Sequence, residues 1–176
     1  TIGGSTAGAR NIISANETYG VYITGAGATG NVVKRNYIGL DSNGTTFITS
    51  STQDYGLYIT TDAASSIIGG SAAGEGNVIS GNSTAGIGFA SAAAAGNSVL
   101  GNIIGPQANG TSNVTSNAQL YGVNIGNASV NNTIGNGVVA GRNIISANLE
   151  RGVYITFAGS NGNLVKGNYI GPSSAL

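Results

Sequence analysis

Apolar and polar positions alternate in short segments that recur along the whole chain. Five segments begin with glycine and place an apolar residue at their second and fourth positions; they start at Gly20, Gly56, Gly86, Gly122 and Gly152. The third position varies between tyrosine, glycine and asparagine. This period of two predicts β-strands with one face buried and the other exposed to solvent. No stretch has the i, i+3, i+4, i+7 spacing of an amphipathic helix.

These segments belong to a 66-residue repeat. Asn-Ile-Ile-Ser at 11–14 becomes Asn-Val-Ile-Ser at 77–80 and Asn-Ile-Ile-Ser at 143–146. The number of residues between successive glycine segments alternates: the interval from Gly20 to Gly56 is longer than that from Gly56 to Gly86. Each repeat therefore contains two coils of unequal length. We predict strands near 1–3, 11–14 and 20–24 in the shorter coil, and near 31–34, 37–39 and 56–60 in the longer one. The chain would form one domain, 1–176, from repeats 1–66, 67–132 and a partial third, 133–176.

Coils of this kind stack into a solenoid, in which each strand pairs with the equivalent strand of the previous coil. The pattern N-x-[IV]-x-x-N, then G-[VIL]-x-[IV], then G-N-x-[VI]-x-x-N-x-I-G resembles right-handed parallel β-helix repeat proteins of the pectate-lyase-like superfamily. It is closest to the Gly/Asn-rich repeat regions of large secreted or surface proteins of microbes. The resemblance spans essentially the whole chain and implies an all-β, right-handed parallel β-helix of about five to six coils. It implies no particular activity, because enzymes, adhesins and passive stalks share this fold.

Charge is scarce along the chain. Asp, Glu, Lys and Arg make up 7% of residues and the net charge is zero, against about 25% charged residues in average proteins. We therefore predict no nucleic-acid partner, and no apolar run is long enough for membrane insertion. Abundant Asn, Ser and Thr with so few charges favour an extracellular or cell-surface location.

The acidic residues do not form a recognisable catalytic pattern. There are six, and no histidine is present; the acids are Glu17, Asp41, Asp54, Asp62, Glu75 and Glu150. Glycoside hydrolysis needs a pair of carboxylates, and no two of these acids are close neighbours in the sequence. We therefore predict that the protein is not an enzyme.

One weak metal site is conceivable at the longer loop. Asp41 and Asp54 bracket this loop and Asp62 follows the next strand, so carboxylates and carbonyls could together hold Ca²⁺. The alternative, that these side chains cap turns and face water, is the better supported. We predict no metal site and no cofactor.

Asparagine is the most systematic polar residue. Four columns repeat at the 66-residue spacing: Asn11, Asn77, Asn143; Asn16, Asn82, Asn148; Asn31, Asn97, Asn163; and Asn36, Asn102, Asn168. We interpret them as a structural ladder at the coil corners, where Asn side chains satisfy unpaired backbone groups and Asn tolerates left-handed φ. A sugar-binding row is the alternative. Glycines that we expect at turns with positive φ are Gly69, Gly70, Gly135 and Gly171.

Tyrosines on the predicted outer face are the best candidates for ligand binding. Tyr22, Tyr58 and Tyr154 occupy the variable position of their strands, where rings could stack on sugars or dock another protein. Cross-strand aromatic pairs also stabilise a sheet without a ligand, and we favour this second interpretation.

N-glycosylation is permitted by seven N-x-[ST] sequons. They lie at Asn16, Asn43, Asn82, Asn109, Asn113, Asn127 and Asn131.

A non-catalytic extracellular structural protein is the function we predict from these features. The coil ends would expose unpaired strand edges, and self-association through them would give a head-to-tail filament or a rod-like stalk. The alternative is a carbohydrate-binding adhesin that uses the tyrosine face or the loops 40–55 and 106–121. A polysaccharide lyase or hydrolase ranks third.

Overall fold

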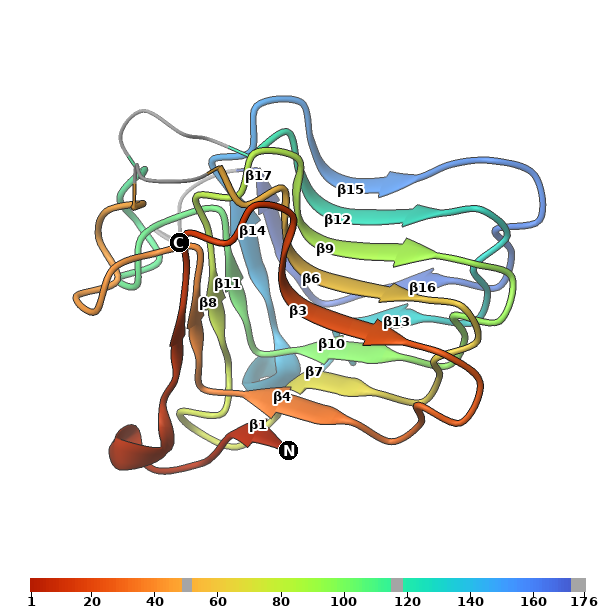
Figure 1. Ribbon diagram of the computed structural model, residues 1–176, viewed down its shortest axis with the longest axis horizontal. Helices are drawn as coiled ribbons and strands as arrows, with labels where there is room; N and C mark the ends of the chain where they lie inside the picture. The colour runs from red at the N-terminus through yellow and green to blue at the C-terminus, as the bar shows by residue number, and fades with distance from the viewer. Residues whose placement is uncertain (49–51, 115–118, 172–176) are drawn as a thin grey trace.

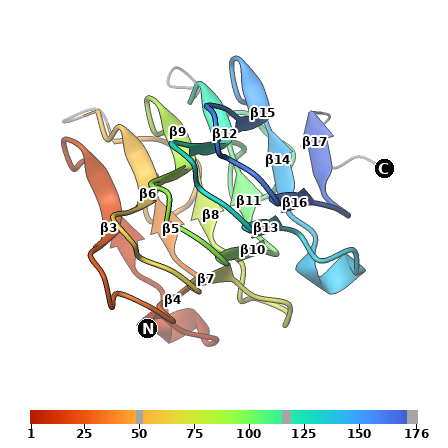
Figure 2. The same ribbon diagram turned by 90° about the vertical axis from the view of Figure 1, so that its right-hand side faces the viewer.

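The computed structural model describes residues 1–48, 52–114 and 119–171 (Figure 1). In this part of the chain, 17 short strands form three parallel sheets, and two single-turn 3-10 helices, η1 (Ala7–Ala9) and η2 (Val139–Gly141), lie between strands. The chain runs clockwise as it recedes from the viewer in Figure 1, and Figure 2 shows the coils advancing from the N-terminus to the C-terminus. The predicted all-β, right-handed parallel β-helix is confirmed.

Each coil contributes one strand to each sheet in turn. Sheet A contains β1 (Ile2–Gly3), β4 (Val32–Lys34), β7 (Ile67–Gly69), β10 (Ser98–Leu100), β13 (Thr133–Ile134) and β16 (Leu164–Val165). Sheet B contains β2 (Ile12–Ile13), β5 (Tyr37–Ile38), β8 (Val78–Ile79), β11 (Ile103–Ile104), β14 (Ile144–Ser146) and β17 (Tyr169–Gly171). Sheet C contains β3 (Tyr19–Thr24), β6 (Tyr55–Thr60), β9 (Ala85–Ala90), β12 (Tyr121–Gly126) and β15 (Arg151–Ile155). The described residues therefore form five three-stranded coils and a sixth coil with strands in sheets A and B.

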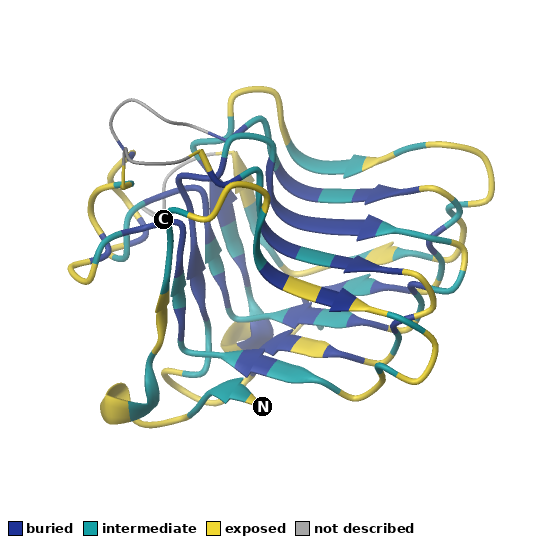
Figure 3. Ribbon diagram, viewed as in Figure 1, coloured by how far each residue is buried: buried dark blue, intermediate teal, exposed yellow. Residues whose placement is uncertain are grey.

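The core is a set of stacked apolar columns inside the coils. In sheet A, Val33 pairs with Ile68 and Ile68 with Val99, and all three side chains are fully buried. In the middle coils the inward residues are buried, whereas the last coils are more open (Figure 3). Ile155 and Ile170, at inward positions there, are each 42% exposed. Stacking on a neighbouring coil is therefore what buries each coil's apolar residues.

The glycine that opens each sheet C strand is required by close packing. At Gly122 a Cβ would lie 2.4 Å from Cγ2 of Ile145 and 2.5 Å from the carbonyl oxygen of Gly152. The backbone passes too close to sheet B and to the next coil for any side chain, which explains why this column is invariant along the repeat.

The expected turn glycines differ in conformation. Gly69, Gly135 and Gly171 have φ of +88°, +76° and +101°, as predicted. The prediction for Gly70 is wrong, because its φ is not positive. A Cβ there would lie 2.2 Å from the Glu75 carboxylate, so it would displace this side chain.

The longer loops cover the outer face of sheet B. Leu40 bridges to Phe47 in antiparallel fashion, and the N–H of Ala108 in the next long loop donates to the carbonyl of Gly44 at 2.8 Å. Phe47 packs in a small apolar cluster with Leu40 and Val78. Residues 49–51 and 115–118 of the predicted binding loops lie outside the described residues. No helix in the described ranges is long and apolar enough to cross a membrane.

Candidate functional site

Six asparagines, one from each coil, form a continuous ladder at the corner between sheets A and B. They are Asn11, Asn36, Asn77, Asn102, Asn143 and Asn168. The main-chain N–H and Nδ2 of Asn77 both donate to Oδ1 of Asn102 at 2.9 Å. Asn102 donates in the same way to Asn143, at 2.9 and 3.1 Å. Two of the predicted columns thus merge into one ladder, in which alternate rungs come from the shorter and longer coils.

The five rungs after Asn11 also satisfy backbone groups. Nδ2 of Asn102 donates to the carbonyl of Ile68 in the previous coil at 2.8 Å and to Leu100 at 3.0 Å. Asn102 is 1% exposed, so these amide groups are removed from water and need protein partners. The ladder replaces the strand pairing that the chain loses where it turns the corner.

A second ladder, at the corner between sheets B and C, alternates asparagine with glutamine. Its members are Asn16, Gln53, Asn82, Gln119 and Asn148. Nε2 of Gln53 donates to Oδ1 of Asn82 at 2.8 Å, and Nδ2 of Asn82 donates to Oε1 of Gln119 at 3.3 Å. Gln53 and Gln119 were not predicted as ladder residues, although they occupy the same position in successive repeats and the repeat could have identified them.

The third ladder, at the corner between sheets C and A, is interrupted. Asn97 donates through N and Nδ2 to Oδ1 of Asn132, at 3.0 and 2.9 Å, and Asn132 donates to Asn163 at 2.9 and 3.1 Å. In the coil before Asn97, Ser66 occupies the position of Asn132, and its buried Oγ has no hydrogen-bond partner. Asn132 was also missing from the predicted columns.

Left-handed conformations occur one residue before the asparagine rungs of the B/C ladder. Ala15, Gly81 and Ala147 precede the B/C rungs Asn16, Asn82 and Asn148, with φ of 60°, 73° and 54°. None of the twelve predicted ladder asparagines has positive φ. Of the two expected reasons for asparagine, tolerance of left-handed φ is therefore wrong, whereas the expected side-chain hydrogen bonds to backbone groups are present.

Tyrosines gather on the outer face of sheet C, at its N-terminal end. The Tyr19 ring stacks on Tyr22 with centroids 4.6 Å apart and on Tyr58 at 5.0 Å, and Tyr55 lies 4.7 Å from Tyr58. Tyr22 is 50% exposed, and the other three rings are less exposed than Tyr22. Tyr55 and Tyr58 extend over Gly88, where a Cβ would meet a Tyr58 ring carbon at 2.7 Å. Burial raises the pKa of Tyr58, and the nearby Tyr19 and Tyr22 raise it further.

Tyr154 belongs to a different group. It pairs with Tyr121, with centroids 5.1 Å apart, and the Arg151 guanidinium lies 4.5 Å from the Tyr154 centroid. The structure thus brings Tyr22 and Tyr58 together, adds the unpredicted Tyr19 and Tyr55, and leaves Tyr154 in a separate pair. Tyr19 contacts Tyr58, and Tyr121 contacts Tyr154, as cross-strand aromatic pairs do. A sugar-binding role for them stays a prediction.

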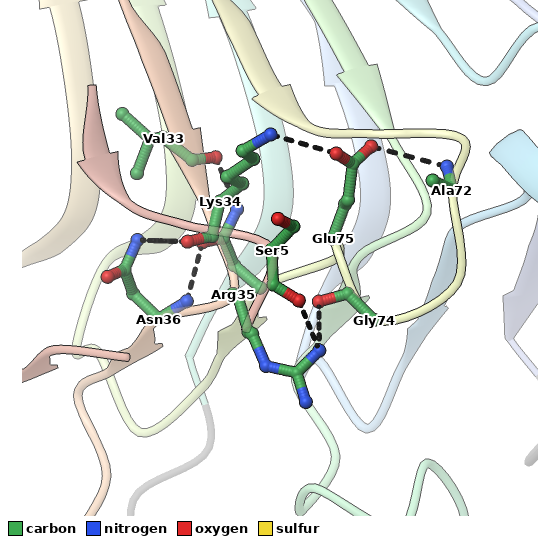
Figure 4. Close-up of polar contacts among 9 residues, drawn as sticks. Ser5, Val33, Lys34, Arg35, Asn36, Ala72, Gly74 and Glu75 are labelled. Carbon is green, nitrogen blue, oxygen red and sulfur yellow. Dashed lines mark hydrogen bonds and ion pairs between the residues drawn. The ribbon is translucent and has the colours of Figure 1, made fainter. Parts of the chain in front are cut away.

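Charged side chains join coils at the A/B corner (Figure 4). Nζ of Lys34 lies 2.8 Å from Oε1 of Glu75, whose other oxygen accepts the N–H of Ala72 at 3.2 Å. These contacts lower the pKa of Glu75, with the Lys34 hydrogen bond the larger cause. The Arg35 guanidinium donates to the carbonyls of Ser5 at 3.3 Å and Gly74 at 2.8 Å. This corner therefore links three successive coils.

The arginines of the repeated Arg-Asn-Ile-Ile-Ser sequence each cover a tyrosine. The Arg10 guanidinium lies 4.0 Å from the centroid of Tyr37, and that of Arg142 lies 4.3 Å from the centroid of Tyr169. These cation–π contacts lie at the A/B corner and connect adjacent coils.

The carboxylates that could have held Ca²⁺ make separate contacts. Oδ1 of Asp41 accepts the N–H groups of Thr45 and Thr46 at 2.9 and 3.1 Å, which lowers its pKa. Oδ1 of Asp54 accepts the Ser83 hydroxyl at 2.8 Å. In the described ranges, no three residues among His, Cys, Asp and Glu form a metal-binding group, and no pocket is present.

The predicted glycosylation sites differ in accessibility. Asn82 is fully buried inside the B/C ladder, so the folded chain cannot accept a glycan at this residue. The other six asparagines are exposed. Thr115, which completes the sequon of Asn113, lies outside the described residues.

Comparisons with protein families, curated proteins and solved structures found no match to this chain.

Proposed function

We propose that this chain is a non-catalytic structural protein, a rod segment of stacked coils that works outside the cell or on its surface. The observation that carries this proposal is the A/B ladder, in which six successive coils repeat one donor–acceptor arrangement. Each coil offers its neighbour the same amide groups, strand edges and apolar surface. A stack built in this way is extended by any further coil with the same pattern. We place it with the pectate-lyase-like β-helix repeat proteins on the basis of its motif.

End-to-end stacking follows from this design. Ile155 and Ile170 occupy inward positions that are buried in the middle coils, yet they are 42% exposed in the last ones. A coil of a second copy placed on this end would cover Ile170 and would extend sheets A and B. The resulting contact joins two different surfaces, so it repeats into a filament.

A matched pair of variants tests this stacking. Ile170→Glu places a charge on the coil end, and Ile67→Glu places one on the outer face of sheet A, where Ile67 is 41% exposed. In about 0.5 M salt, where charge attraction is screened, we expect the mass of the unmodified chain by light scattering to rise with concentration and rods to appear by electron microscopy. Ile170→Glu should abolish this growth and Ile67→Glu should retain it. A monomeric mass at every concentration would contradict the proposal.

A further inference from the structure

The few charges of this chain are sorted between its corners. Of the six basic residues, five lie at the A/B corner: Arg10, Lys34, Arg35, Arg142 and Lys166. The same corner holds one acid, Glu75. Five positive and one negative side chain give this edge of the coil stack a net charge of +4, although the whole chain is neutral.

The adjacent corner, between sheets B and C, has the opposite charge. Four of the six acids lie there: Glu17, Asp41, Asp54 and Glu150. Arg151, the first residue of β15, is the one base beside them and pairs with Glu150 at 2.6 Å. The net charge of this edge is −3, and the remaining acid, Asp62, lies at the third corner.

Most of the basic charge is not neutralised within the fold. Arg35 donates to carbonyl groups, Arg142 donates to the Gly167 carbonyl at 3.1 Å and covers a tyrosine ring, and Arg10 also covers a ring. These partners hold the guanidinium groups in place without cancelling their charge. Lys34 forms the one ion pair found at this corner among the described residues.

The two edges carry opposite net charges in the first and second coils, whereas in the third coil the A/B corner carries Glu75 and the B/C corner no charge. In the first coil Arg10 lies at one corner and Glu17 at the other. In the second coil, Lys34 and Arg35 correspond to Asp41 and Asp54. In the fifth, Arg142 lies at the A/B corner, and Arg151 balances the charge of Glu150 at the B/C corner. The described part of the fourth coil has no charge at either corner.

We propose that copies of this protein associate side by side, parallel and in register, with the A/B corner of one copy against the B/C corner of the next. Each copy then presents a basic edge on one side and an acidic edge on the other, so the contact is heterologous and repeats into a lateral array. The occupant is a second copy because the chain's own acidic edge has the charge opposite to its basic edge, and the two edges match coil by coil in the first two coils. This inference does not depend on the end-to-end stacking proposed above.

Ionic strength provides the first test. Sedimentation equilibrium is measured on the intact chain in about 0.01 M and about 0.5 M salt, where the screening length falls from about 30 Å to a few ångströms. We expect the mass to exceed that of the 17.2 kDa monomer at low salt, at least doubling, and the side-by-side species to dissociate at high salt. A mass that is monomeric at low salt, or an association indifferent to salt, overturns the proposal.

Charge reversal provides the second test. Glu17→Lys reverses an exposed acid at the B/C corner, and Asp62→Lys makes the same change in net charge at the third corner. Glu17→Lys should weaken the low-salt association by about tenfold or more, because an attractive contact becomes repulsive, and Asp62→Lys should leave it unchanged. Equal effects of the two variants would show that only net charge matters, and would overturn the proposal.

Mixing separates lost pairing from lost folding. Arg10→Glu with Arg142→Glu takes the basic edge from +4 to 0, and Glu17→Lys with Glu150→Lys takes the acidic edge from −3 to +1. Neither double variant should associate alone at low salt, whereas an equimolar mixture should, because the unchanged acidic edge of the first variant then meets the unchanged basic edge of the second. Failure of the mixture, with both variants folded by circular dichroism, contradicts the proposal. The proposal is also contradicted if the chain stays monomeric at low salt and binds polyglutamate, a polyanion, instead.

Discussion

The A/B and C/A corners use the same device with different completeness. At the A/B corner every coil supplies an asparagine, and each of the first five donates through its N–H and Nδ2 to the next. At the C/A corner, Ser66 stands between Asn31 and Asn97, and its hydroxyl has no partner although it is fully buried. The N–H of Ser66 still donates to Oδ1 of Asn97 at 2.9 Å. The backbone thus keeps the ladder geometry, and only the length of the side chain decides whether the chain of amides continues.

The largest effect should come from removing a rung of the complete ladder. Asn102→Ala leaves the N–H and Nδ2 of Asn77 without their acceptor in a site that is 1% exposed. Unsatisfied buried groups are costly, and we expect the free energy of unfolding to fall by about 3 kcal/mol. Urea titration followed by far-ultraviolet circular dichroism measures it. Ser66→Ala is the control from the interrupted ladder and should change the free energy of unfolding by less than about 0.5 kcal/mol. A similar loss of stability in both variants would contradict the difference between the two corners.

A smaller effect of opposite sign should follow from completing the interrupted ladder. In Ser66→Asn, the new amide takes the place that Asn132 has one repeat later, where Nδ2 donates to Ala94 and Asn163. Ala28 and Asn97 occupy the equivalent positions in the preceding repeat, so both partners are present. We expect a gain of about 1 kcal/mol, measured by the same titration. Destabilisation would mean that the core beside Ser66 has no room for the longer side chain.

The smallest effect concerns the residue before a rung. Ala147 has φ of +54° and precedes Asn148, while Gly81 has φ of +73° at the equivalent place before Asn82. Ala147→Gly should stabilise the fold by about 0.5–1 kcal/mol, because L-residues are strained in this region. Gly81→Ala should destabilise it, since a Cβ would also lie 2.8 Å from Cβ of Phe47. Opposite shifts in the thermal midpoints of the two variants check this; shifts in the same direction would refute the assignment.

Much of the fold could be predicted from the sequence, because a solenoid makes contacts local to the repeat. Strand positions, the unequal coil lengths and the glycine column all follow from the repeat spacing. The ladder partners Gln53 and Gln119 could have been predicted from the same spacing. The cation–π pairs were harder to predict from the sequence, because Arg10 contacts Tyr37 in the following coil. The number of residues between them does not match the repeat interval. The middle repeat has Gly76 and Ile103 at these two positions, so arginine and tyrosine are present together or absent together.

The sequence by itself determined which residues are equivalent, and the tertiary structure decided which residues touch. The repeat relates coils that are two apart, whereas parallel pairing joins neighbouring coils. Only this pairing merges the Asn11 and Asn36 columns into one ladder. It also sorts a neutral set of charges into a basic edge and an acidic edge, because residues far apart in sequence reach the same corner once each turn of the coil. Composition alone showed no charged surface, since opposite charges cancel in a sum but not when they lie on different edges.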